Sequence, residues 1–465
     1  MSAARLTAAT AGRPVRHEEP RFEVAPDSAQ TRRATETLQA LIDRSKVSAG
    51  PIDVSFRQLV GPIPVNNLSH SIYPYPARLL RQIPRFFLHC RQIVSRGDVV
   101  LDPFCGSGTV LVEARAAHLA SWGIDSNPLA RLLSEVKTTP LDAGRAQQAA
   151  SDLLRQAQAF RSATIPDVVN VDVWFNRPVQ QALGRLRRAI LESDVSADLQ
   201  RFLLVALALT AERCSLRDSR IPVPVRRHDW KTVAAAQGSI DVWQTFAAVS
   251  SSVAARLATV PIPPGITTVV EGDDAAKAHA VFQDRLKDRL QRPAVILTSP
   301  PYGAAQKYIR SSSLALGWTG LAMSSDLAAL ERKLIGREHL RRSEFLSLDT
   351  PLPSIGNEID HLARRDKVRA AIYAHYFRAM GGVIENLVSL LAPGGAFVMV
   401  AGSNSVAGEE IQTHRHLKDL AVAYGMAPVL ELRDAIRGRV LLTKRASADA
   451  PLKAETVHVL RKTLQ

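Results

Sequence analysis

Cysteines and long apolar runs are both scarce in this chain of 465 residues. The three cysteines, Cys90, Cys105 and Cys214, are widely spaced and odd in number, which argues against a disulfide framework and against a zinc site. No run approaches the roughly 18 apolar residues that span a membrane, and the N-terminus lacks the apolar core of a secretory signal. We therefore expect a cytoplasmic protein with no membrane partner and no bound metal.

Acidic residues are also in deficit. Lys and Arg number 59 against 44 Asp and Glu, which gives a formal charge of +15. Such an excess favours a polyanionic partner, although an Arg-rich solvated surface explains the same numbers. The hydrophobic content of 46% is enough for one large elaborated domain or for two domains.

Short apolar runs that end in turn residues alternate with segments of helical spacing. We expect strands at residues 98–102, 121–124, 267–270, 294–298 and 396–401. Strands that alternate with helices indicate a parallel sheet with right-handed crossovers, and ligands of such sheets bind outside the carboxyl ends of the strands.

Two long segments interrupt this alternation. Residues 130–264 are predicted to be a helical insertion, and residues 318–370 a charged insertion. Around them we expect a disordered leader over 1–34, the first half of the sheet over 35–129, its second half over 265–317, and the rest of the sheet over 371–465. Within these, the spacing predicts a helix over 35–46, a loop over 50–67 and a closing hairpin of 429–432 with 439–443.

A glycine turn follows the first predicted strand. Gly106 and Gly108 lie between this strand and a helix, where a missing Cβ lets a bound nucleoside or amino acid approach the backbone. Leu111 stands where a dinucleotide fingerprint has its third glycine, which disfavours NAD. Asp125 ends the second strand and is placed to bind ribose hydroxyls, or alternatively to cap a helix.

The sequence Thr-Ser-Pro-Pro-Tyr follows the fourth predicted strand, so it should face the same crevice as the glycine turn. An exocyclic amine of a nucleobase is a poor nucleophile because its lone pair is delocalised into the ring. The hydroxyl of Ser299 and the carbonyl of Pro300 could accept its two N–H bonds and free the lone pair. Pro300 and Pro301 stiffen the loop, and Tyr302 offers a ring for a base that has left the helix stack. A rigid turn without chemistry is the alternative.

Residues 101–109, with the sequence LDPFCGSGT, resemble the first motif of the DNA amino-methyltransferases. The resemblance implies an α/β, Rossmann-like class I methyltransferase fold with a mostly parallel seven-stranded sheet and a helical insertion. It also implies that residues 35–129 carry the cofactor-binding half, that residues 265–317 carry the catalytic half, and that the cofactor is S-adenosylmethionine. The cofactor contacts that it implies are Tyr75, Asp102, Phe104, Gly106, Gly108, Thr109, Asp125, Asp273 and Asp274. For Tyr75, and for Tyr73 beside it, packing against the sheet edge is the alternative.

The same resemblance implies a double-stranded DNA substrate that is methylated on a flipped base. Ser299 at the head of the tetrapeptide is typical of N4-cytosine enzymes, whereas an acid or Asn is more usual in N6-adenine enzymes. An RNA methyltransferase of the guanine-N2 type and a catalytically inactive DNA-binding homologue are the alternatives. A cognate restriction or defence system would be a further partner.

Target recognition would fall to one or both insertions. The helical insertion carries Arg217, Arg220, Arg226 and Arg227, and the second insertion is dense in charge. Residues 306–310 either shape the base pocket or cap a helix. Residues 433–439 are either a phosphate-contacting loop or a solvated turn.

Overall fold

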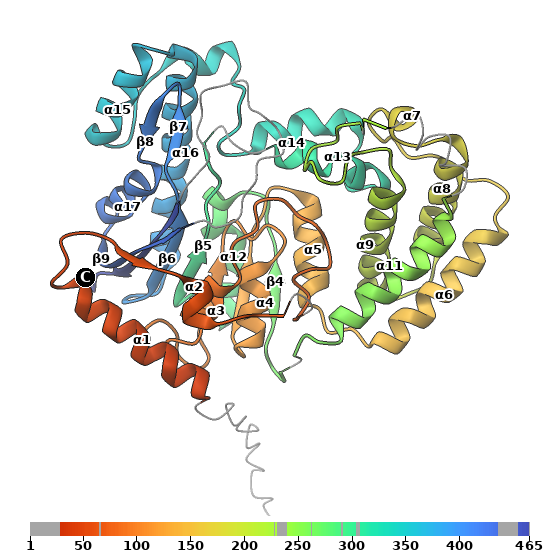
Figure 1. Ribbon diagram of the computed structural model, residues 1–465, viewed down its shortest axis with the longest axis horizontal. Coiled ribbons are helices and arrows are strands. Elements are labelled where there is room, and N and C mark those ends of the chain that lie inside the picture. Colours follow the sequence, from red (N-terminus) through yellow and green to blue (C-terminus); the bar gives the residue numbers. More distant parts are fainter. Residues whose placement is uncertain are drawn as a thin grey trace, which may run out of the picture.

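The computed structural model describes residues 28–64, 67–226, 228–229, 240–261, 263–289, 292–303, 307–435 and 454–464. Its centre is an eight-stranded sheet in the order β1-β9-β10-β6-β5-β2-β3-β4 (Figure 1). β10 is antiparallel to both of its neighbours, and the other pairs of this sheet are parallel. The strands are β1 (Ile52–Val54), β2 (Val99–Asp102), β3 (Ala120–Gly123), β4 (Thr268–Val270), β5 (Val295–Thr298), β6 (Ala396–Ala401), β9 (Met426–Ala435) and β10 (Ala454–Lys462).

The predicted mostly parallel sheet is confirmed, with one strand more than expected. Residues 50–67 were predicted to be a loop, but they contain β1 and the short helix α2 (Phe56–Val60). β1 is only three residues long, too short for a recognisable sequence pattern, and it joins the sheet by pairing with β9. A separate two-stranded ribbon is formed by β7 (Asn404–Val406) and β8 (Glu409–Ile411).

The predicted closing hairpin pairs the wrong segments. β9 pairs along its length with β10, not with residues 439–443, which lie outside the described residues. β10 is inserted between β9 and β6, so Val457, Val459 and Leu460 are buried. That burial outweighs the shorter loop of the predicted hairpin.

The first helix begins earlier than the spacing predicted. α1 (Ala29–Ser45) starts where the hydroxyl of Ser28 accepts a hydrogen bond from the backbone N–H of Thr31 at 3.1 Å. Ala34, Leu38 and Leu41 of α1 are buried. The predicted disordered leader is therefore wrong over residues 29–34, and residues 1–27 lie outside the described part of the chain.

Alternate residues of the central strands point into two different cores. In β2, Leu101 packs with α12 (Ala278–Arg289), α15 (Pro353–Ala363), α16 (Lys367–Leu390) and α17 (Thr413–Ala423). Val100 packs on the opposite face with α1, α3 (Gln82–Phe87) and α4 (Thr109–Ala116). Both faces of the sheet are therefore covered, as a parallel sheet requires.

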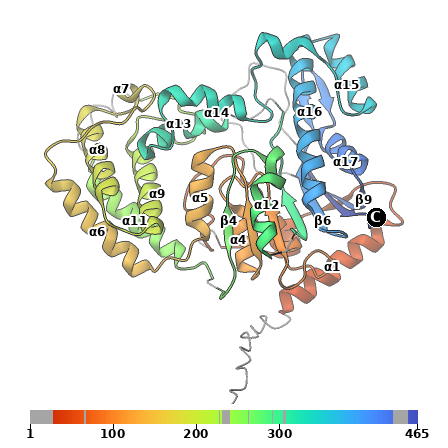
Figure 2. The same cartoon turned by 180° about the vertical axis from the view of Figure 1, so that it is seen from behind.

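The helical insertion of the predicted fold is present. Its helices are α5 (Pro128–Thr138), α6 (Ala143–Ala159), α7 (Val171–Trp174), α8 (Arg177–Glu192), α9 (Ala197–Cys214) and α11 (Val242–Leu257). Together with α13 (Tyr308–Thr319) they surround a third core, in which Trp318 packs edge-on against Phe175 at 5.4 Å between centroids. Figures 1 and 2 show α6, α8, α9 and α11 beside the sheet, with α5 between the two units.

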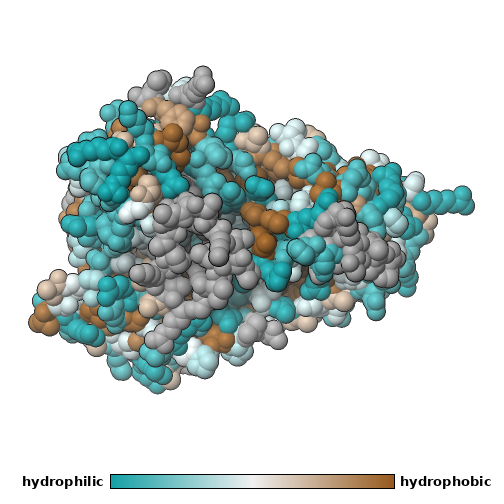
Figure 3. All heavy atoms as spheres, turned by 45° about the horizontal axis from the view of Figure 1, so that its top comes forward, coloured by the Kyte–Doolittle hydropathy of each residue, from teal (hydrophilic) through white to brown (hydrophobic). Residues whose placement is uncertain are grey.

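The described residues of the charged insertion form helices and no strand, and α15 packs against the sheet. The insertion contains the 3₁₀ helices η3 (Ser324–Asp326) and η4 (Arg342–Leu346), the helix α14 (Leu327–Lys333) and α15. Ile355, Ile359 and Leu362 of α15 are fully buried. On the face shown in Figure 3, hydrophobic side chains form small groups among hydrophilic ones. Within the described residues, no helix has the length and apolar character needed to cross a membrane.

Candidate active site

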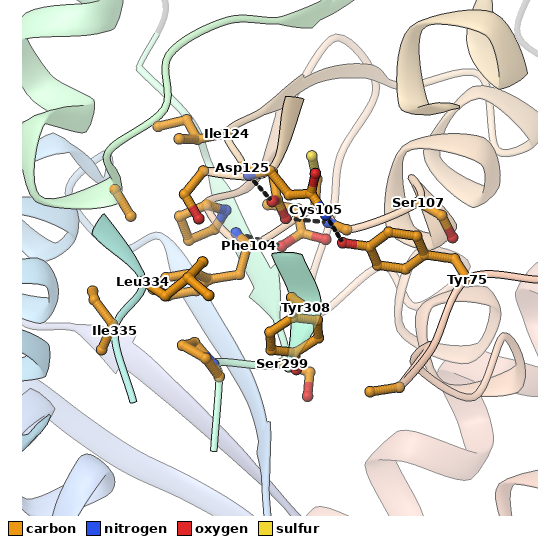
Figure 4. A pocket seen from close by; sticks show the side chains of 18 of the residues that line it. Tyr75, Phe104, Cys105, Ser107, Ile124, Asp125, Ser299, Tyr308, Leu334 and Ile335 are labelled. Atoms are coloured by element: carbon orange, nitrogen blue, oxygen red, sulfur yellow. Dashed lines mark hydrogen bonds between the residues drawn. The ribbon is translucent and has the colours of Figure 1, made fainter. Parts of the chain in front are cut away.

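A cavity of about 940 Å³, open to solvent, lies at the carboxyl ends of β2, β3 and β5 (Figure 4). The structure therefore brings the glycine turn and the Ser-Pro-Pro-Tyr loop to one pocket. The predicted site residues that line it are Tyr75, Asp102, Phe104, Gly106, Thr109, Asp125, Asp273, Asp274, Ser299 and Pro301. Gly108, Pro300 and Tyr302 are not among its lining residues.

The two glycines of the turn have different structural roles. Both adopt positive φ angles, 50° at Gly106 and 79° at Gly108. A Cβ on Gly106 would face the ring of Tyr75 at 3.7 Å, inside the pocket, whereas a Cβ on Gly108 would lie 2.9 Å from the hydroxyl oxygen of Ser134 on α5. Gly106 thus keeps the pocket open, and Gly108 lets α5 pack against the start of α4.

Asp102 ends β2 at the floor of the pocket. Its Oδ1 accepts hydrogen bonds from the hydroxyl of Thr298 at 2.6 Å and from the backbone N–H of Phe104 at 3.1 Å. Burial raises the pKa of this carboxyl to about 7, because a charged form loses its hydration there. The hydrogen bond to Thr298 connects the end of β2 to the end of β5, where the Ser-Pro-Pro-Tyr loop begins.

Asp125 follows β3, as predicted, and fixes the glycine turn. Its two carboxylate oxygens accept hydrogen bonds from the backbone N–H groups of Gly106 and Asn127, both at 2.8 Å. Burial raises the pKa of Asp125 as well. The cap of α5 is Asn127, whose side chain accepts from the N–H of Leu129, so the alternative of Asp125 as the helix cap does not hold.

Tyr73 and Tyr75, which lie upstream of the glycine turn, have different surroundings. Tyr75 lines the pocket, and its hydroxyl accepts a hydrogen bond from Nδ2 of Asn127 at 3.0 Å. Tyr73 instead donates to Glu212 of α9 at 3.4 Å, so it packs toward the helical insertion. The same Asn127 amide also donates to the hydroxyl of Ser312 on α13 at 3.0 Å.

Asp273 and Asp274, two of the predicted cofactor contacts, both line the pocket. Asp274 caps the 3₁₀ helix η2 (Ala275–Lys277) by accepting from the N–H of Ala276. Asp273 pairs with Lys333 at 2.7 Å, and this hydrogen bond lowers the pKa of Asp273. Both carboxylates therefore already have partners within the protein.

The Ser-Pro-Pro-Tyr loop leaves β5 at Thr298. Ser299 and Pro301 face the pocket, but Tyr302 points elsewhere and donates its hydroxyl to Oε1 of Glu455 on β10 at 3.1 Å. The Tyr302 ring does not line this pocket, and its predicted role toward a flipped base stays a prediction. The loop is short, and its turn after two prolines directs the ring toward β10.

Several lining residues were missed by the sequence analysis. Lys333, Leu334 and Ile335 come from the charged insertion and form one wall (Figure 4). Cys105 lies inside the recognised motif, and Tyr308 lies in the stretch predicted to shape the base pocket; Gln306 of that stretch lies outside the described residues. No local signal marks Leu334 and Ile335, since only the tertiary fold brings them to the glycine turn.

The predicted DNA-contacting arginines have protein partners nearby. Arg217 forms an ion pair with Glu212, and Arg220 with Asp218, while Arg227 lies outside the described residues. Arg433 pairs with Asp53 at 2.6 Å, and residues 436–439 of its predicted phosphate loop also lie outside the described part.

A second cluster of polar side chains lies away from this pocket, at His414, Glu431 and His458. Nδ1 of His414 and Nε2 of His458 are 3.0 Å apart, and the two ring planes differ by only 17°. The centroid separation of 5.3 Å is that of two coplanar rings joined edge to edge by a hydrogen bond. These nitrogens point at each other and do not converge on an ion.

Comparison with known proteins adds independent information. The family model described as DNA methylase (N6_N4_Mtase) matches residues 66–133, a range that includes Tyr75, the glycine turn and Asp125. A Type II methyltransferase of Kocuria varians, M.MvaI, is 24% identical over 391 residues, which cover 77% of this chain and 82% of that protein. These matches support a relationship to the DNA amino-methyltransferases.

Two further matches are shorter or weaker. M.MjaII, a Type II methyltransferase of Methanocaldococcus jannaschii, is 34% identical over 91 residues, which cover 20% of this chain and 17% of that protein. The rRNA methyltransferase aviRa of Streptomyces viridochromogenes superposes with a TM-score of 0.32 at 11% identity, covering 88% of this chain and 96% of that chain.

These similarities indicate a methyltransferase that uses S-adenosylmethionine. The pocket fits that cofactor in its chemistry. Gly106 leaves room at the turn, and the carboxyl groups of Asp102 and Asp125 suit a ligand with a sulfonium charge and ribose hydroxyls.

Proposed function

We propose that this methyltransferase modifies an exocyclic amino group of a flipped base in duplex DNA, with N4 of cytosine favoured over N6 of adenine. The observation that supports this most is the presence of Ser299 and the glycine turn in the lining of one pocket. A methyl donor held at the turn would then face a base held at Ser299. The serine at this position is typical of N4-cytosine enzymes.

Each proposed residue has a definite task. Asp125, Asp273 and Tyr75 would bind and orient the cofactor, and Asp102 would face its charged end. The hydroxyl of Ser299 and the carbonyl of Pro300 would accept the two N–H bonds of the target amine, which frees the nitrogen lone pair. Bound S-adenosylmethionine supplies the electrophilic methyl group.

Recognition of the DNA is proposed to involve both insertions. The charged insertion of residues 318–370 forms a wall of the pocket through Leu334 and Ile335. The helices of the helical insertion lie beside the sheet. A cognate restriction or defence system is proposed as a partner, since both Type II relatives carry names from that class of enzyme.

Transfer of a tritiated methyl group to DNA and to RNA tests the proposal, with the wild type and Ser299→Ala side by side. We expect the wild type to label duplex DNA, Ser299→Ala to lose at least about a hundredfold in kcat, and hydrolysed product to contain N4-methylcytosine. Labelling of RNA alone would favour the guanine-N2 alternative. A wild type that binds the cofactor yet labels neither would be the inactive DNA-binding homologue.

A further inference from the structure

Two tyrosine hydroxyls of α16 donate hydrogen bonds to the backbone of residues 299–303, which are called the catalytic loop from here on. Tyr376 donates to the carbonyl of Pro301 at 2.9 Å, and Tyr373 donates to the carbonyl of Gly303 at 2.9 Å. The two residues are one helical turn apart, so they face the loop from the same side of the helix. Each is only 1% exposed, so these bonds are shielded from water.

Other elements hold the same stretch of backbone. Nδ2 of Asn404 on β7 donates to the carbonyl of Gly303 at 3.0 Å. Gly336 of the charged insertion lies so close that a Cβ there would be 2.4 Å from the carbonyl oxygen of Tyr302. The carbonyl of Pro300, in contrast, receives no hydrogen bond from the described part of the chain.

Prolines restrict the first half of this loop. Ser299 and Pro300 each precede a proline, which confines both to extended conformations. The remaining freedom lies at residues 301–303, where the chain turns away from the strand. The bonds from Tyr373 and Tyr376 act there, and they fix the peptide planes that follow Pro300.

We propose that Tyr373 and Tyr376 are positioning residues that hold the catalytic loop so that the carbonyl of Pro300 stays free and aimed at the target amine. They act through the backbone and do not touch the base. This inference rests on the proposed function, because it assigns the Pro300 carbonyl the task described there. Without the two hydroxyls, Pro301 and Gly303 would turn and the acceptor pair would lose its alignment.

The test compares Tyr376→Phe and Tyr373→Phe with Tyr424→Phe, a tyrosine that ends α17 outside the pocket. For each we would measure kcat and KM with duplex DNA, and the Kd of S-adenosylmethionine by calorimetry. We expect kcat to fall about tenfold in each of the first two variants, with KM and Kd unchanged, because alignment is lost and binding is not. Tyr424→Phe should match the wild type.

Asn404→Ala is a second variant in case a buried tyrosine change prevents folding. It removes the other donor to Gly303 from a half-exposed position, and we expect a smaller fall in kcat at constant KM. If the wild type methylates DNA and the Tyr→Phe variants keep full kcat, or lose kcat and cofactor affinity together, the positioning role is wrong. If the wild type itself methylates no DNA, the proposed function fails first.

Discussion

Asp102 accepts hydrogen bonds that connect two strands, and its carboxyl group also faces the cofactor pocket. Its hydrogen bonds to Thr298 and Phe104 need only an acceptor oxygen, which a protonated carboxyl or an amide also provides. Its charge is a separate matter, since burial brings its pKa to about 7. A change of pH near neutrality therefore alters the charge of the pocket without breaking these bonds.

The first prediction follows from the sulfonium charge of the donor. A cation beside Asp102 favours the carboxylate and lowers its pKa, so S-adenosylmethionine should bind more tightly as pH rises toward about 7 and level off above it. The total gain should be about tenfold for each unit by which the cofactor lowers this pKa. Asp102→Asn should bind with little dependence on pH. Calorimetry between pH 6 and 8 checks this, with S-adenosylhomocysteine, whose sulfur is neutral, as the control ligand. Equal pH profiles for both ligands would contradict the prediction.

The second prediction concerns Lys137, which is 1% exposed behind the glycine turn and donates to the carbonyl of Ser107 at 2.8 Å. Burial lowers its pKa from 10.5 to about 7. Between these values the unfolded chain binds more protons than the folded one, so this group makes stability rise with pH from about 7 to about 10. Thermal unfolding of Lys137→Met should show a flatter rise over that window. Lys46→Met, at an exposed position of α1, should keep the wild-type profile.

Part of the pocket could be predicted at this scale because those residues lie in short, specific motifs. Asp102, Gly106, Asp125 and Ser299 were predicted from sequence and line one pocket. Asn127 was missed because an Asn before Pro128 looks like an ordinary helix cap. It is one, and its amide also joins Tyr75 to α13, which only the fold reveals.

At the scale of elements, the segment after α14 connects two parts of the site. Leu334 and Ile335 line the cofactor pocket, and the next residue, Gly336, adopts a φ of 79° against the catalytic loop. One short stretch of the charged insertion therefore borders both the pocket and the Ser-Pro-Pro-Tyr loop. Movement of this insertion on DNA binding would therefore shift the pocket wall and the Ser-Pro-Pro-Tyr loop together.

The third prediction tests that contact with Gly336→Ala. The new Cβ would lie 2.4 Å from the carbonyl oxygen of Tyr302, so the loop must shift and kcat should fall by about tenfold to a hundredfold. Gly408→Ala is a matched control, because Gly408 has a φ of 81° and open space around it. The two variants share the backbone strain, and only Gly336→Ala pushes on the loop. Steady-state kinetics with equal losses in both would mean that strain alone accounts for the effect.

The elements themselves were predictable where apolar runs were strong. β2, β5 and β6 are buried on both faces and stand out in the sequence. β1 could not be predicted, because three residues are too few to show the alternation of apolar and polar side chains. The partner of β9 could not be predicted either, because its pairing with β10 depends on burial between segments distant in sequence.

At the scale of the whole molecule, the sequence placed both insertions but not their contacts. The composition marked residues 318–370 as charged, yet α15 is anchored by Ile355 and Ile359, and α13 belongs to the core of the helical insertion. Such assignments depend on packing between distant segments, which hydrophobic spacing alone does not specify.

The fourth prediction concerns the net charge of +15. If DNA is the substrate, each phosphate contact releases counterions, and binding should weaken by about 10³ or more between about 50 and 200 mM salt for several such contacts. The KM for S-adenosylmethionine should change little over this range, because its pocket is small and partly buried. Kinetics at a series of KCl concentrations would measure both, and a salt-insensitive KM for DNA would contradict the prediction.

The order of strands has a consequence for synthesis on the ribosome. β1 is attached to the sheet through β9, and β9 is attached through β10. Ile52–Val54 emerges early, but it has no docking place until residue 462 has been made. The backbone of this early segment therefore stays unpaired with the sheet through most of translation. Because the segment is only three residues long, few unpaired backbone groups are available to other nascent chains.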